Sequence, residues 1–185
     1  MGEVTKLLQR VKTGEAGARD VLFATVYDEL LKVARQRLSG SATPTQLDPP
    51  ALVHEAYLRL VRQQVLSGDN RAEFLAYAST VMRNVVVDFV RERLAQKRGG
   101  DARRVTLNTR IGEEMVADDT DLEALSLALD HLAQADARSH RIVEMRYFGG
   151  LTLEEIGEIE SLSLATVKRD WQKARAFLYD ALHSP

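Results

Sequence analysis

The stretch from Leu151 to Arg175 changes the sign of its charge part-way along. Its first half holds the acids Glu154, Glu155, Glu158 and Glu160, and its second half holds the bases Lys168, Arg169, Lys173 and Arg175. Bases gathered on one segment are suited to binding nucleic-acid phosphates, because the counterions released on binding supply much of the affinity. If the second half lies against the phosphates, the first half lies further away, and its acids are then not strongly repelled.

Spacing and capping signals in the same stretch predict a helix-turn-helix. Thr152 and Glu155 form a capping-box pattern, and Ser161 to Ser163 supply the turn, with Ser163 able to cap the second helix. Val167, Trp171, Ala174 and Leu178 recur at helical spacing and predict its buried face. The residues predicted to face DNA are Thr166, Lys168, Arg169, Gln172, Lys173 and Arg175. The alternative is a solvated amphipathic hairpin, and Trp171 is read as core rather than as a base-stacking residue.

A second basic stretch runs from Arg83 to Arg104, with seven bases against three acids. Phe74, Tyr77 and Phe89 lie among these bases or just before them. Positive charge interleaved with aromatic rings can hold a single strand whose bases are stacked or extruded. A helix with a basic face and aromatic core residues explains the same pattern, so this stretch alone is a weak signal.

No pattern of catalytic or metal-ligating residues stands out. The chain has no cysteine, which excludes disulfides and thiolate chemistry. His54 is followed by Glu55, but no second histidine comes four residues later, as a zinc-protease helix requires. Asp118, Asp119 and Asp121 lack the spacing of a calcium loop. We therefore expect no enzyme activity, no metal and no cofactor.

Composition is that of an ordinary globular protein. The 185 residues are 45% hydrophobic and 28% charged, with a formal net charge of −2, so any binding to nucleic acid must rest on local patches. No apolar run approaches 18 residues, and the N-terminus lacks a signal-peptide core. These features predict a cytoplasmic protein with no membrane partner.

Helical periodicity predicts an all-α fold made of two small helical bundles joined by an acidic linker. Breaks fall at "SATPTQLDPP" and "LSGDNRAE", and a helix is expected to begin at the proline pair, Pro49 and Pro50. The β-prone run Val85 to Val87 is kept helical because its flanks show a 3.6-residue period. Six acids and no base lie between Gly112 and Glu123, which predicts an exposed linker. The expected domains are residues 1–100, the linker 101–122, and residues 123–185.

The order of these parts resembles the bacterial RNA polymerase sigma factors of the extracytoplasmic-function (ECF) group. The resemblance covers nearly the whole chain. Its most specific stretches are "EAYLRL", "RNVVVDFVRER" and "YFGGLTLEEI…TVKRDWQKAR". It implies an N-terminal bundle that grips the polymerase and opens the minus-ten element, and a C-terminal bundle that reads the minus-thirty-five element. The implied partners are promoter DNA and core RNA polymerase, through its β′ clamp and β flap.

The resemblance assigns roles residue by residue. The helix Ala51–Val61 carries the clamp contact, with the implied polymerase-binding residues Asp48, Glu55 and Arg59. The loop 67–73 captures a flipped base, and the implied minus-ten residues are Asp69, Asn70, Arg71, Arg83, Asn84, Asp88 and Arg91. The acidic linker threads toward the RNA exit path, where its carboxylates imitate a nucleic acid. A plain solvated linker accounts for those acids equally well.

The stretch "LDPPALVHE" departs from the family pattern. Asp48 is present, but Pro49, Pro50 and Ala51 stand where further acids are usual, which weakens a charge-assisted contact with a basic clamp. Phosphorylation of Thr43 or Thr45 by a Ser/Thr kinase is one route that restores negative charge, in place of control by an anti-sigma factor. A turn with capping hydroxyls is the simpler interpretation of the two threonines.

A rival of another class is a stand-alone transcriptional regulator. It uses the terminal helix-turn-helix for duplex binding and the N-terminal bundle for dimerisation or sensing. The basic stretch Arg83–Arg104 argues against this rival, because a dimerisation bundle does not require it. A third alternative, a decoy that occupies polymerase without touching DNA, conflicts with the bases of the second helix.

Overall fold

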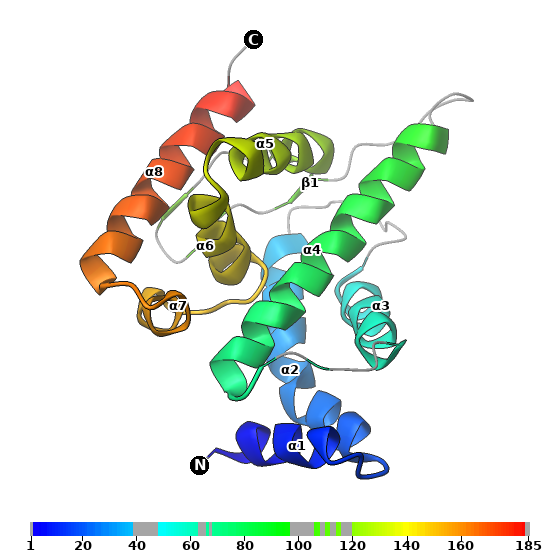
Figure 1. The fold of residues 1–185 in the computed structure, drawn as a ribbon. Coiled ribbons are helices and arrows are strands. Elements are labelled where there is room, and N and C mark those ends of the chain that lie inside the picture. The colour runs from blue at the N-terminus through cyan, green and yellow to red at the C-terminus, as the bar shows by residue number, and fades with distance from the viewer. Residues whose placement is uncertain are drawn as a thin grey trace.

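The computed structural model describes residues 2–38, 48–62, 66, 68–96, 106–107, 110–111, 114–115 and 120–183 (Figure 1). Eight helices account for most of these residues, which confirms the all-α class. The helices are α1 (Glu3–Lys12), α2 (Ala18–Leu38), α3 (Pro49–Arg62), α4 (Arg71–Gln96), α5 (Leu122–Ala135), α6 (Ala137–Tyr147), α7 (Leu153–Glu160) and α8 (Leu164–His183).

Helices α1 to α4 pack as the N-terminal bundle. Apolar residues of α1 at helical spacing, Val4, Leu7, Leu8 and Val11, are all buried. As expected, α3 begins at the proline pair, where proline's missing N–H is not needed and its φ suits the first turn. Asp48 caps this helix, because its Oδ1 accepts a hydrogen bond of 2.7 Å from the backbone N–H of Ala51.

The valine run in α4 is helical, as its flanks predicted. Val85, Val86 and Val87 are all buried. Burying three branched side chains contributes several kcal/mol, which exceeds the few tenths per residue by which valine disfavours a helix. Tertiary packing therefore overrides local propensity in this helix.

Helices α5 to α8 form the C-terminal bundle. The predicted capping box begins α7: the backbone N–H of Glu155 donates to Thr152 Oγ1 at 3.1 Å, and that of Thr152 donates to Glu155 Oε2 at 2.8 Å. At the start of α8 the backbone N–H of Thr166 donates to Ser163 Oγ at 3.2 Å, which confirms that cap too. Trp171 is 1% exposed and lies in the core, as its spacing predicted.

Short strands appear where only a linker was expected. β1 (Thr106–Leu107) pairs antiparallel with β4 (Thr120–Asp121), and β2 (Arg110–Ile111) pairs antiparallel with β3 (Glu114–Met115). The inner pair is nested within the outer pair along the sequence, and β1 contacts α2. Strands of two residues are too short to show an alternation of apolar and polar side chains. The sequence pattern therefore could not predict them.

The two bundles pack against each other along α4. Figure 1 shows α4 running between α3 on one side and α6 on the other, and α4 also contacts α5 and α7. A single apolar cluster runs from Val4 in α1 to Leu178 in α8, so both bundles share one core. The Arg37 side chain is buried at this junction: its Nε donates to the Tyr147 carbonyl at 2.9 Å, and its guanidinium lies 4.3 Å from the Tyr147 ring centroid.

Candidate nucleic-acid interface

Most of the α8 face predicted to contact DNA, which we call the recognition face, is exposed. Lys168, Arg169, Gln172 and Lys173 are exposed, whereas Thr166 and Arg175 are half-buried. Opposite them, Val167, Trp171, Ala174 and Leu178 are buried and fix the rotation of the helix. Lys168, Arg169 and Lys173 therefore share one solvent-facing side, which is the arrangement that the phosphates of a duplex require, whereas the Nε of Arg175 is buried.

Two carboxylates outside the predicted set hold parts of this face in place. Asp136 caps α6 and also accepts a 2.8 Å hydrogen bond from Lys173 Nζ. This contact, reinforced by hydrogen bonds from Ser139, holds the pKa of Asp136 well below its usual range. Asp170 is buried and binds Arg138 Nε at 2.8 Å, while Arg169 Nε lies 3.7 Å from its other oxygen.

These supporting residues were missed by sequence reasoning. Asp136 did carry a local signal, because aspartate is a favoured N-cap residue and it directly precedes α6. The link from Arg138 to Asp170 left no such signal, because the two residues lie 32 positions apart.

The turn of the helix-turn-helix contains a strained serine. Ser161 has φ of 55° and ψ of 42°, the left-handed region that favours glycine. We expect Ser161→Gly to raise the free energy of unfolding by about 0.5–1 kcal/mol, because glycine adopts this conformation without the side-chain penalty. Urea unfolding followed by circular dichroism measures this change. Ser163→Ala serves as the contrasting variant, since removal of that cap should lower stability by about 1 kcal/mol.

Two of the cations predicted to bind the minus-ten strand lie at the junction of the bundles. Arg83 is 14% exposed; its Nη2 donates to Asp130 Oδ1 at 2.6 Å, and its Nε lies 3.3 Å from Glu144 Oε1. Arg71 pairs with Glu29 of α2, and its Nη1 donates to Glu155 Oε1 of α7 at 2.9 Å. Both guanidinium groups are thus bound to carboxylates of the C-terminal bundle.

The loop predicted to capture a flipped base is engaged in capping α4. Asn70 Oδ1 accepts from the backbone N–H of Glu73 at 3.0 Å, and Asn70 Nδ2 donates to Glu73 Oε1 at 2.9 Å. The backbone N–H of Asp69 donates to Glu73 Oε2 at 2.7 Å, and the Asp69 carboxylate pairs with Lys12. Asp69 and Asn70 are exposed, so base capture by this loop stays a prediction.

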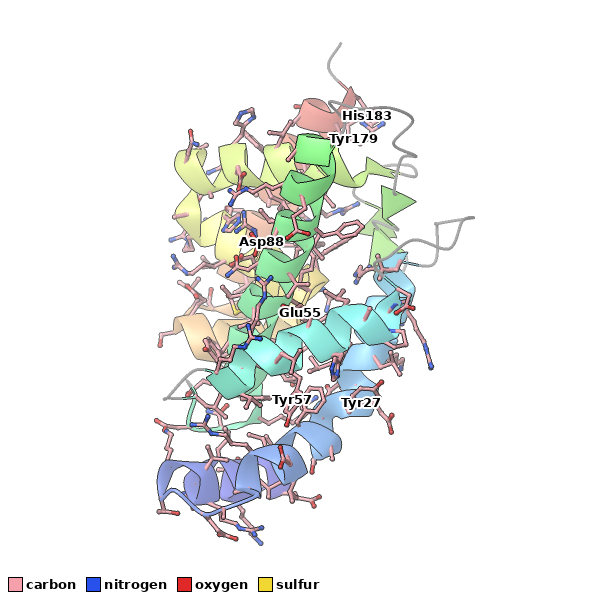
Figure 2. All side chains as sticks on the ribbon, turned by 90° about the vertical axis from the view of Figure 1, so that its right-hand side faces the viewer. Tyr27, Glu55, Tyr57, Asp88, Tyr179 and His183 are labelled. Carbon is pink, nitrogen blue, oxygen red and sulfur yellow. The ribbon has the colours of Figure 1, made fainter. Side chains whose placement is uncertain are left out.

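The remaining predicted residues lie on one outer face. Figure 2 shows Glu55 on α3 and Asp88 on α4 on the side turned toward the viewer. Arg59 joins them, with Nη1 2.7 Å from Asp88 Oδ2 and Nε 3.2 Å from Glu55 Oε1. Asn84 and Arg91 are exposed on the same helix as Asp88. Arg59 therefore links the segment assigned to the polymerase with the segment assigned to DNA.

A buried histidine lies beside Arg83. The His140 ring is buried and its Nδ1 lies 3.9 Å from Glu144 Oε2. Burial, and then the positive charge of Arg83, lower the pKa of His140 from 6.5 to about 4. Between these two values the unfolded chain binds more protons at this residue than the folded chain, so stability decreases as the pH falls.

We expect the titration of His140 to lower the free energy of unfolding by about 2 kcal/mol as the pH falls from 7 to 5. His140→Gln should remove that part of the pH dependence in urea titrations, whereas H183Q, at an exposed position, should keep it. Burial raises the pKa of Glu144, which acts in the opposite direction, so comparing the variants isolates His140. Equal pH dependence in the parent and His140→Gln contradicts the prediction.

The described helices include none that is both long and apolar enough to cross a membrane. Within the same part of the chain, no group of three or more histidine and carboxylate side chains has the arrangement of a metal site.

A family model described as "ECF sigma factor" matches residues 1–184. The chain belongs to the ECF sigma factor family. A curated relative, "ECF RNA polymerase sigma factor BldN" of Streptomyces coelicolor, is 25% identical over 172 residues. That alignment covers 88% of this chain and 60% of the relative, so the ECF chain spans a little over half of that protein's length.

Proposed function

We propose that this ECF family member is a promoter-specificity factor that brings core RNA polymerase to a promoter and helps to open it. The observation that carries the proposal is the family match over residues 1–184, which takes in both the basic face of α8 and the strand-binding residues of α4. The protein itself performs no chemistry in this role. Binding to an extruded base and to the displaced strand offsets the few kcal/mol that unstacking costs.

Each bundle has its own part in the proposal. Residues 1–100 bind the β′ clamp through α3 and engage the minus-ten strand through α4. Residues 123–185 contact the β flap and read the minus-thirty-five element with α8. Residues 101–122 connect them along the RNA exit path, and the whole complex works in the cytoplasm.

Run-off transcription tests the function directly. Purified core polymerase is supplied with the full chain and a library of genomic fragments from the source organism, and the transcripts are sequenced. Discrete start sites that depend on the chain support the proposal. A free homodimer that binds duplex DNA but directs no initiation by core polymerase would instead identify a stand-alone regulator.

Control of the factor is a finer part of the proposal. Thr43 and Thr45 lie outside the described residues, three to five positions before Asp48, whose carboxylate caps α3. A phosphate there would supply negative charge near a segment with prolines at positions where its family carries acids. Control by an anti-sigma factor is the alternative.

Variants of both threonines separate these modes of control. We expect T43D or T45D to bind core polymerase more tightly than the alanine variants in gel filtration. Equal binding by all variants rejects the phosphorylation proposal and leaves control by an anti-sigma factor or by expression.

A further inference from the structure

Arg59 of α3 reaches across to α4 and binds an acid there. Its Nη1 donates to Asp88 Oδ2 at 2.7 Å, and its Nε donates to Glu55 Oε1, one turn earlier on α3, at 3.2 Å. The Arg59 side chain is 29% exposed, so these contacts are partly shielded from water. A planar guanidinium has several fixed donors, which allows one cation to bind an acid on each of two helices.

Asp88 stands in the middle of an outward-facing stripe on α4. Asn84 precedes it by four residues and Arg91 follows it by three, so the three side chains lie on one face of the helix. Asn84 and Arg91 are exposed, and the Asp88 side chain is 44% exposed. Figure 2 shows Asp88 on the side turned toward the viewer, together with Glu55 of α3. A strand that lies along this stripe brings its phosphates close to a carboxylate.

A carboxylate without a partner at this position would repel a nucleic-acid strand. Two like charges a few ångströms apart weaken an association by a factor of about five or more, even when water screens them. Arg59 offsets the charge of Asp88 from the side of α3. The neighbouring Asn84 and Arg91 then meet the strand without an opposing charge between them.

We propose that Arg59 is a positioning residue for the minus-ten strand: it neutralises Asp88, so that Asn84 and Arg91 can contact the strand. Arg59 acts through Asp88 and does not itself touch the DNA. This role rests on the proposed function, because that function is what places a strand on α4. It differs from the polymerase contact that the family resemblance assigned to Arg59, since two donors of the guanidinium are already bound within the chain.

A double-mutant cycle tests the proposal. Arg59→Gln removes the positive charge but keeps a hydrogen-bond donor, and Arg59→Lys keeps the charge; each is made with and without Asp88→Asn. Every variant is first assembled with core polymerase and purified by gel filtration, so that each complex carries the chain. Fluorescence anisotropy then gives the affinity for a fluorescein-labelled single strand that bears the minus-ten sequence of a promoter identified by run-off transcription.

Arg59→Gln should weaken strand binding about five- to tenfold while Asp88 is present, the effect of one like-charge contact. With Asp88→Asn in place, the same change should weaken binding less than about twofold. Arg59→Lys should retain most of the affinity, because it still neutralises Asp88. Equal losses with and without Asp88→Asn overturn the proposal, and so does an Arg59→Lys variant as defective as Arg59→Gln.

Glu92 provides the matched control for charge. It is exposed on α4, four residues after Asp88, and Glu92→Gln removes the same charge. Combined with Arg59→Gln, it should leave the loss of strand binding in place. If Glu92→Gln restores binding as well as Asp88→Asn does, only the total charge of α4 matters and the proposal is wrong.

Folding and function are checked separately. Urea unfolding followed by circular dichroism compares the stability of the variants, and a folding defect would weaken binding whichever residue occupies position 88. Arg59→Met, uncharged and of similar length, replaces Arg59→Gln if the glutamine variant does not fold. A parent complex that starts transcription at no promoter contradicts the proposed function. A parent complex that initiates, with no coupling between positions 59 and 88, contradicts only the role of Arg59.

Discussion

Replacing Trp171 by alanine should lower the free energy of unfolding of the C-terminal bundle by about 3–5 kcal/mol. Trp171 is 1% exposed and is the chain's single tryptophan. Its removal leaves a large cavity between α8 and the helices packed on it, and the surrounding side chains close such a cavity only partly. Urea unfolding followed by far-ultraviolet circular dichroism measures the decrease, because tryptophan fluorescence disappears with the residue.

Tyr179 offers a matched aromatic control on the same helix. It is 52% exposed and stacks on His183 near the end of α8, with ring centroids 4.1 Å apart. Tyr179→Ala should therefore change stability by less than about 1 kcal/mol. If Trp171→Ala destabilises no more than Tyr179→Ala, the tryptophan is not a core residue, and its interpretation as a base-stacking residue regains support.

Replacing both Lys168 and Arg169 of α8 by alanine should weaken promoter binding on the order of 100-fold. Lys168 and Arg169 are exposed on the recognition face, and the Arg169 side chain is 72% exposed despite its contact with Asp170. A side chain that binds a phosphate or a base edge is expected to contribute about 1–3 kcal/mol, and each phosphate left unbound should reduce the salt dependence by about one unit of slope. Gel-shift titration of the polymerase complex over a range of salt concentrations measures both effects.

The control for this double variant removes the same charge elsewhere. Lys32 and Arg35 are exposed on α2, and Lys32→Ala combined with Arg35→Ala should leave promoter affinity within a fewfold of the parent. The promoter fragment is one identified by run-off transcription. An equal decrease in the two double variants would show that only total charge matters, and α8 would then lose its assignment as the reader of the minus-thirty-five element.

Local signals predicted most of the helices and their ends. The proline pair set the start of α3, the capping box set the start of α7, and apolar spacing placed Trp171 in the core. The exposed bases of α8 followed from the same spacing, since residues opposite a buried face must point to solvent. These successes rest on interactions between residues three or four positions apart, which a sequence displays directly.

Partners that are distant in sequence could not be predicted in this way. Arg83 and Asp130 are 47 positions apart, and Arg71 and Glu155 are 84 positions apart. The sequence placed Arg83 in a basic stretch, and the family resemblance assigned both arginines to the minus-ten strand, but nothing near them indicated the carboxylates that bind them. β1 and β4 were missed for the same reason, because the whole inner pair separates them, whereas β2 and β3 are neighbours that are too short to show an apolar alternation.

The sequence by itself determined the helices, their caps and the basic face of α8, because i to i+4 spacing and end-capping are properties of a short segment. Only the tertiary structure decided that the two bundles share one core and that Arg71 and Arg83 pair with acids from distant helices. The physical reason is that a helix exposes its surface to whichever element packs on it. Which element that is depends on the shape and charge of the whole chain. Arg71, for example, pairs with Glu155, which lies 84 positions away in the sequence.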